Sequence, residues 1–417
     1  MKAATKSSLL KNVVAVCGAY LWAGMGYVVS LWLQLSLLPA LLLTIFPAFL
    51  WVYGVSRFLT LQDDAGTANA TTWQLPIACI ILTAAACVMI KAHGEYDAWL
   101  HWNSLARYMS SPSFFAYLHQ EHSLWHADYP PGLPAAIGFV WRLLGDFPEW
   151  VPRSVSFLFY LATVLLLCSA AAKVSAFPRL WLVVLMLFAF NFECLSQGLN
   201  QYADVPLSLM LLLVFMLLDS YKCAPQNFQL FLLGFFMGAC MLFKNEGMML
   251  AICVMLVYAR VWLRRNRALW LLAGLFPPVV LLLLYKQYIP QSNDLLEGFG
   301  SNFWHGLVRP ENYLILLRRS VRVIGGRFPL PLLFSIWCLW QLCRKPHFLK
   351  SRKLCSLILC FGGFSFIYLT TSYDIVWLTN TSFNRILMQL LPSFIYFLIE
   401  ALRKAYPENV HANNHNS

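Results

Sequence analysis

Residues 206 to 221 read PLSLMLLLVFMLLDSY, a run in which Asp219 is the only charged residue. Long apolar runs with few charges and no polar face are typical of helices that cross a membrane. The same pattern recurs along the chain, and we expect spans at residues 10–31, 33–57, 74–91, 153–173, 179–193, 206–221, 229–243, 248–263, 268–285, 328–343, 354–371 and 385–402. The sequence therefore predicts an all-α polytopic membrane protein with about twelve transmembrane helices.

Composition supports this class and excludes others. The chain has 417 residues, of which 60% are hydrophobic and 12% charged, whereas soluble domains carry about 25% charged residues. The net charge of +12 does not indicate nucleic acid, because the positive residues lie in short loops beside apolar runs. The twelve cysteines lie mostly within those runs, so we expect no disulfide framework. We expect no cleavable signal peptide, because the first apolar run is too long and leads directly into a second.

Lysine and arginine in short loops predict the orientation, because cytoplasmic loops are enriched in both. With twelve spans, all the basic clusters lie on one side, and both termini are cytoplasmic. The clusters are Lys2, Lys6 and Lys11; Lys173 and Arg179; Arg264, Arg265 and Arg267; Arg344, Lys345, Lys350, Arg352 and Lys353; and Arg403 with Lys404.

The opposite face then receives two long loops, at 92–152 and 286–327, in which we expect interfacial helices. Residues 1–73 form two additional N-terminal spans with a cytoplasmic loop, and residues 74–402 form the catalytic module. Residues 403–417 form a cytoplasmic tail that we expect to be disordered.

The first long loop carries two acids where a helix leaves the membrane, Glu95 and Asp97. Trp99 and Trp102 follow at a spacing that predicts an amphipathic interfacial helix. A carboxylate at the membrane surface could take a proton from an acceptor hydroxyl or hold a metal ion. The alternative is a solvated loop acid.

Two further polar motifs fall in the external loops. His126, Asp128 and Tyr129 precede Pro130, Pro131 and Gly132, which predict a rigid turn into the next helix. Tyr202 and Asp204 precede the apolar run at residues 206–221. We expect these residues to contact the substrate or the acceptor, although Asp204 could simply cap its helix.

Cations lie at the external ends of other runs. Lys244 and Glu246 interrupt two apolar segments, and Arg385 heads the last span. Ionisable residues at membrane depth indicate function, and Lys244 and Arg385 are suited to binding a phosphate. Alternatively, Lys244 and Glu246 pair with each other. The arginines between residues 309 and 327 predict a basic helix that lies on anionic headgroups or helps to hold an anionic donor.

Together these motifs resemble the GT-C superfamily of membrane glycosyltransferases, and in particular the branch of protein O-mannosyltransferases and bacterial aminoarabinose transferases (family 39-like). The resemblance covers residues 74 to 400. It lies in the order of Glu95–Asp97, Tyr129–Gly132, Tyr202–Asp204, Lys244–Gly247 and Arg385 with Pro392.

The resemblance implies a polyprenyl-phosphate sugar donor, inversion at the sugar carbon, and Asp97 as general base with Glu95 as its rival. The two spans before the acid and the lack of a large C-terminal domain depart from the family pattern. The resemblance leaves open whether a divalent metal is required.

We therefore expect an inverting glycosyltransferase of the bacterial inner membrane, acting at the periplasmic face on a glycan, lipid or protein. An O-antigen polymerase or ligase is one alternative, and a secondary transporter is another.

Overall fold

The computed structural model describes residues 9–59, 74–89, 93–118, 128–223, 227–262, 267–289, 303–343, 346–370 and 373–407, and every regular element within these ranges is helical. The all-helical fold class is thus confirmed. The elements are α1 (Leu9–Trp32), α2 (Leu37–Phe58), α3 (Gln74–Met89), the π-helical turn η1 (Ala98–Trp102), α4 (Asn103–Met109), α5 (Phe114–Leu118), α6 (Gly132–Leu144), α7 (Trp150–Ala171), α8 (Leu180–Ala189), α9 (Phe192–Leu199), α10 (Asp204–Cys223), α11 (Asn227–Phe243), α12 (Glu246–Trp262), α13 (Arg267–Lys286), α15 (Phe303–Val308), α16 (Pro310–Arg327), α17 (Pro329–Leu342), the 3-10 turn η2 (Pro346–Lys350), α18 (Arg352–Thr370) and α19 (Ile375–Ala405).

Among the described residues, seven helices are long and apolar enough to cross a membrane, or up to nine if each of two bent helix pairs forms one span. The seven are α1, α2, α7, α10, α13, α18 and α19. The other predicted spans also fall on helices, but α3, α11 and α12 have only 16 or 17 residues. Such helices are about 25 Å long, short of a hydrocarbon core of about 30 Å. The count of twelve stays a prediction.

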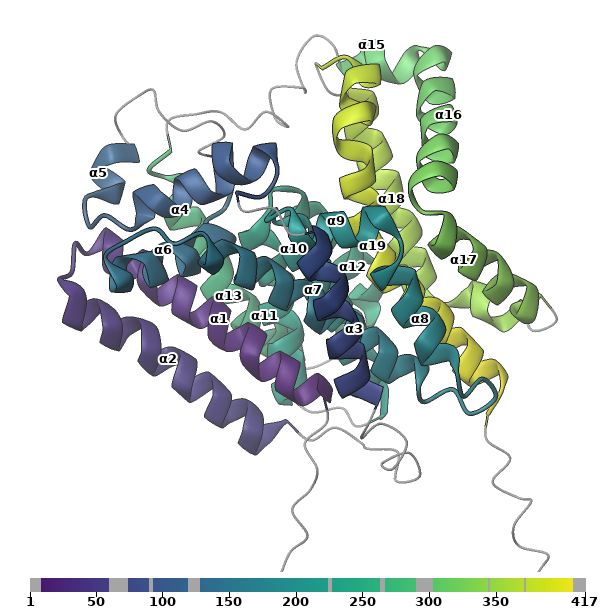
Figure 1. The fold of residues 1–417 in the computed structure, drawn as a ribbon, viewed down its shortest axis with the longest axis horizontal. Coiled ribbons are helices and arrows are strands. Elements are labelled where there is room, and N and C mark those ends of the chain that lie inside the picture. Colours follow the sequence, from purple (N-terminus) through teal and green to yellow (C-terminus); the bar gives the residue numbers. More distant parts are fainter. Residues whose placement is uncertain are drawn as a thin grey trace, which may run out of the picture.

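Helix α10 lies at the centre of the bundle, between α7, α11 and α19 (Figure 1). Every residue from Gln201 to Leu218 is buried. A helix that is apolar on all sides has no face to turn toward solvent and is placed in the interior. The run that predicted a membrane span therefore forms the core against which the other helices pack.

Helix α2 lies on the outside of the bundle, where it packs against α1 (Figure 1). Its outer face carries exposed apolar side chains, among them Leu38, Leu42 and Phe49. Contiguous exposed apolar surface on this scale is typical of a protein that meets lipid. Helix α1 is joined to the rest of the fold, since Tyr20 Oη donates to Leu133 O at 3.0 Å and Tyr27 Oη donates to Met109 O at 2.6 Å.

One predicted span is bent, and another begins at a bend. The run predicted at 179–193 is divided into α8 and α9, which meet at 66°. The break comes at Asn191, whose side chain accepts from Cys194 N at 3.0 Å and caps α9. Most of the predicted loop at 194–205 is therefore helix. The run predicted at 328–343 corresponds to α17, which meets α16 at 99° where Pro329 ends the hydrogen-bond ladder.

The last helix begins earlier than predicted. Asp374 accepts from Trp377 N at 2.7 Å and caps α19, which then runs from Ile375 to Ala405. The placement of Arg385 at the head of the last span is thus wrong, because three turns of polar and apolar helix precede it. The helix also continues into the segment predicted as tail, of which residues 408–417 lie outside the described ranges.

A buried ion pair marks the end of α10 that lies away from Asp204. Lys353 Nζ donates to Asp219 Oδ2, and Tyr396 Oη donates to the same oxygen at 2.9 Å. Lys353 is only 2% exposed. The two acids of α10 are about 22 Å apart, given a rise of 1.5 Å per residue. The cluster of Arg352 and Lys353 therefore lies at the opposite end of the bundle from Asp204. The side of the membrane it faces stays a prediction.

Removal of Lys353 tests how much this pair stabilises the fold. Lys353→Ala leaves Asp219 buried without its cation, so we expect the free energy of unfolding to fall by about 3–5 kcal/mol. Arg153→Ala is the control, because its pair with Glu149 at 2.9 Å is partly exposed and contributes under about 1 kcal/mol. Equal losses in SDS-induced unfolding of the two variants in detergent micelles would contradict this assignment.

Candidate functional site

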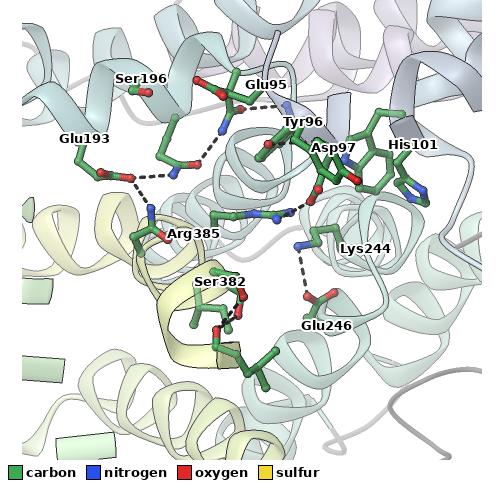
Figure 2. A pocket seen from close by; sticks show the side chains of 18 of the residues that line it. Glu95, Tyr96, Asp97, His101, Glu193, Ser196, Lys244, Glu246, Ser382 and Arg385 are labelled. Atoms are coloured by element: carbon green, nitrogen blue, oxygen red, sulfur yellow. Dashed lines mark hydrogen bonds and ion pairs between the residues drawn. The ribbon is translucent and has the colours of Figure 1, made fainter. Parts of the chain in front are cut away.

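A cavity of about 840 Å³ opens where α9, α18, α19 and the break between α11 and α12 meet the loop before η1 (Figure 2). One wall is polar and the other is largely apolar. The polar wall includes Glu95, Asp97, His101, Asp128, Glu193, Gln197, Lys244, Glu246, Arg327, Asn384 and Arg385. The apolar wall includes Phe364, Ile367, Trp377, Leu378 and Ile386. The cavity thus brings together segments that lie far apart in the sequence.

Asp204 lies beneath this cavity and contacts Lys244 and Arg385, the two residues predicted to bind a phosphate. Its side chain is fully buried and accepts from Lys244 Nζ at 3.1 Å, from Arg385 Nε at 3.1 Å and from Gln389 Nε2 at 2.5 Å. As the first residue of α10, it also lies at the positive end of a helix dipole. A sugar could not reach this carboxylate, so its predicted role in direct sugar binding does not fit the structure. Asp204 instead fixes the two cations.

Arg385 contacts both Asp204 and Asp97, and Figure 2 shows its contact with Asp97. Its Nη1 lies 2.5 Å from Asp97 Oδ2. The guanidinium also covers the ring of Tyr202, with 4.5 Å from Cζ to the ring centroid. Burial raises the pKa of Tyr202 to about 12, so the phenol is neutral at ordinary pH. Its oxygen accepts from Asp97 N at 3.2 Å, which fixes the Asp97 backbone beside the phenol oxygen.

The loop that carries Asp97 is joined to the loop before α10. Glu95 N donates to Asn200 O at 3.2 Å, and Asn103 Nδ2 donates to Gln201 Oε1 at 2.8 Å. Gly94 and Gln201 both adopt left-handed backbone conformations, with φ of 72° and 65°. The π-helical turn η1 follows Asp97 directly, and such turns are frequent at functional sites. Trp102 at the end of this turn is buried, whereas Trp99 is exposed.

Lys244 comes from the break between α11 and α12. Its Nζ lies 3.2 Å from Glu246 Oε1 and 3.1 Å from Asp204 Oδ1. The ion pair between Lys244 and Glu246 that the sequence offered as an alternative is therefore present. Glu246 Oε2 is buried and has no hydrogen-bond partner among the described residues. A buried acceptor without a donor is unfavourable, and it makes this carboxylate a candidate to receive a substrate hydroxyl.

Asp128 and Tyr129 are held at the cavity by residues from other helices. Asn245 Nδ2 donates to Asp128 Oδ2 at 2.7 Å, and Lys286 Nζ donates to Asp128 O and, at 3.0 Å, to Asn245 Oδ1. Burial, followed by the nearby Glu246 carboxylate, raises the pKa of Tyr129 well above its usual value. His126, the third predicted residue of this motif, lies outside the described residues.

Glu193 is a cavity residue that sequence reasoning did not single out. It is 4% exposed, and it accepts from Asn384 Nδ2 at 2.6 Å, from Gln197 Nε2 at 2.8 Å and from Arg327 Nη1 at 3.3 Å. An acid at the end of an apolar run, two residues after Asn191, was the available signal. It went unused because residues 179–193 read as a single span.

The site offers acids, cations and amides, which can provide hydrogen bonds and charge. Among the residues that the structure describes, no three histidine, cysteine, aspartate or glutamate side chains lie close enough together to hold a metal ion.

No protein-family model, curated protein or solved structure matches this chain. The likeness to GT-C glycosyltransferases therefore rests on the sequence motifs alone and stays a prediction.

Gly94 provides a test of how the Asp97 loop is held. A Cβ at this position would lie 2.7 Å from Ala98 Cβ and 2.8 Å from Asn200 O. Together with the left-handed backbone, this should make Gly94→Ala cost about 2 kcal/mol or more. Gly145 is a matched control, because it has φ of 70° but nothing within 4 Å of its added Cβ. Gly145→Ala should cost about 1 kcal/mol. If the loop were free to move away from the added Cβ, SDS-induced unfolding would give the same free-energy cost for both variants.

Proposed function

We propose that this chain is an inverting glycosyltransferase that uses a polyprenyl-phosphate sugar donor. The observation that carries the proposal is one cavity in which the part-exposed carboxylate of Asp97 lies beside two cations, Lys244 and Arg385, anchored from below by Asp204. An anionic leaving group and a hydroxyl acceptor require this combination, because one needs positive charge and the other needs a proton acceptor.

The donor phosphate would bind at Arg385 and Lys244. Arginine can place two N–H donors on phosphate oxygens, and lysine supplies a point charge. Both cations are fixed by Asp204, so little reorganisation is needed when negative charge develops on the departing oxygen. The apolar wall formed by α18 and α19 would hold the first part of the polyprenyl chain, where Phe364, Ile367 and Trp377 line the cavity.

The acceptor would bind on the side of Asp97. In the proposed reaction Asp97 takes the proton of an acceptor hydroxyl, whose oxygen attacks the anomeric carbon from the face opposite the phosphate. The bond between that carbon and the phosphate oxygen breaks, and polyprenyl phosphate leaves with the bonding electron pair. Glu95 is the second candidate for the base. Glu193, Gln197 and Glu246 offer polar groups to the hydroxyls of the sugar or the acceptor.

The acceptor class is a glycan, a lipid or a protein at the outer face of the membrane. The bacterial inner membrane with a periplasmic site is the setting in which such donors and acceptors meet. This part of the proposal rests on the loop charges and the donor class.

Replacing Asp97 tests the proposed base. With a synthetic polyprenyl-phosphate sugar as donor and cell-envelope extract as acceptor, Asp97→Asn should lower the transfer rate by about 10²- to 10⁴-fold. The substitution removes the proton acceptor but keeps the shape of the side chain. Glu95→Gln is the matched control and should retain most activity. Full activity in a folded Asp97→Asn protein would remove Asp97 as base, and loss only in Glu95→Gln would transfer the role to Glu95.

An O-antigen polymerase or ligase is the second candidate, and one contact favours it. Arg327 at the end of the basic helix α16 lines the cavity and lies 3.3 Å from Glu193. That alternative assigns the chemistry to the arginine-rich segment.

Arg327→Ala discriminates between the two candidates. The glycosyltransferase proposal expects a loss under about tenfold, because Arg327 pairs with Glu193 and is 61% exposed. The alternative expects a loss of about 100-fold or more, with Asp97→Asn active. Arg322→Ala, an exposed arginine of the same helix, controls for the general charge of α16.

A further inference from the structure

We infer that the donor phosphate and Asp97 compete for Arg385, so that donor binding releases Asp97 to act as the base. This inference rests on the proposed function and adds a binding order to it. The base is held by Arg385 until the donor arrives, and the acceptor can be activated only afterwards.

The first reason is that no cation of the cavity is free of a carboxylate, among the residues that the structure describes. Lys244 lies 3.1 Å from Asp204 and 3.2 Å from Glu246. Arg327 pairs with Glu193 at 3.3 Å. Arg385 pairs with Asp97 at 2.5 Å and with Asp204 at 3.1 Å. An incoming phosphate therefore has to displace a carboxylate or share a cation with one.

The second reason is that Asp97 is the carboxylate most easily displaced. Its side chain is 36% exposed, against 14% for Glu246, 5% for Glu193 and 0% for Asp204. Exposed ion pairs are weak because water solvates both partners when they separate. Asp204 is harder to displace, because its carboxylate would stay buried without a cation. The phosphate should therefore replace Asp97 and leave Asp204 in place.

The geometry of the guanidinium points the same way. Asp204 occupies Nε, and Asp97 occupies one hydrogen of Nη1. A phosphate that binds the outer edge of the group must use the Nη atoms, and Figure 2 shows Asp97 at that edge. Two anions on one nitrogen repel each other at close range. Asp97 then turns away from Arg385 toward the cavity, where the acceptor would lie.

The exchange has a geometric consequence for Asp97. While Arg385 is paired with Asp97, the Oδ2 atom accepts from Nη1 and is directed at the guanidinium. Once the phosphate takes Arg385, this oxygen is available to accept from the hydroxyl of the acceptor. The base is therefore exposed to the acceptor only when a donor is present. This order would keep an acceptor from binding productively at an empty donor site.

Binding of farnesyl phosphate to the full-length protein in detergent tests the competition. Asp97→Asn removes the competing charge, so we expect its dissociation constant to fall by about threefold or more. Arg385→Ala should raise the dissociation constant by at least about tenfold. Asp146→Asn removes one negative charge from an exposed loop outside the cavity lining, and its constant should change by less than about twofold.

The outcomes separate the inference from the proposed function. Unchanged or weaker binding in Asp97→Asn overturns the competition, as does an equal gain in Asp146→Asn, while the glycosyltransferase proposal stands. The proposed function fails if the wild-type protein does not bind farnesyl phosphate. It also fails if the protein binds farnesyl phosphate but transfers no sugar from the synthetic polyprenyl-phosphate sugar. Asp97→Ala provides a second test of the same expectation should Asp97→Asn not elute as a folded protein in size-exclusion chromatography.

Discussion

The arrangement of this protein depends on the hydrogen bonds that the buried carboxylate of Asp204 accepts. It accepts hydrogen bonds from three side chains that belong to two other parts of the bundle, Lys244 after α11 and Arg385 with Gln389 on α19. Burying an ion is costly, and removing one partner of a buried pair typically costs about 3–5 kcal/mol. The three elements cannot shift independently without leaving a charge unpaired. Asp204 thus fixes the distance between α10, the α11–α12 break and α19, and with it the floor of the cavity.

Several polar residues of the site lie where helices break. Lys244 and Asn245, which line the cavity, separate α11 from α12. In an apolar environment the free N–H and C=O groups at such breaks need partners, and between α8 and α9 the side chain of Asn191 supplies one by accepting from Cys194 N. Arg385 differs, because it lies within α19. At the other end of α10, the pair of Lys353 and Asp219 satisfies the charges that remain inside the bundle.

Much of the site followed from single residues that interrupt apolar runs. Asp97, Lys244 and Arg385 were each conspicuous for this reason, and the structure brings all three to one cavity. Glu193 and Lys286 were not singled out, because each lies at the end of a predicted apolar run and does not interrupt it. The start of α19 was misplaced for a similar reason. Counting apolar residues selected Arg385, whereas the hydrogen bond from Trp377 N to Asp374 determines where the helix begins.

The sequence by itself determined the helical class, the apolar runs that form the helices, and the residues that carry charge beside them. These properties depend on local composition and on hydrogen bonds between neighbouring turns, which a linear pattern records. Only the tertiary structure decided which charges pair. Asp97 and Arg385 are separated by 288 residues, and Asp204 and Arg385 by 181. Periodicity carries no information about contacts at such separations, because they depend on how whole helices pack. For that reason the structure alone distinguished Asp204, which holds the cations, from Asp97, which faces the cavity.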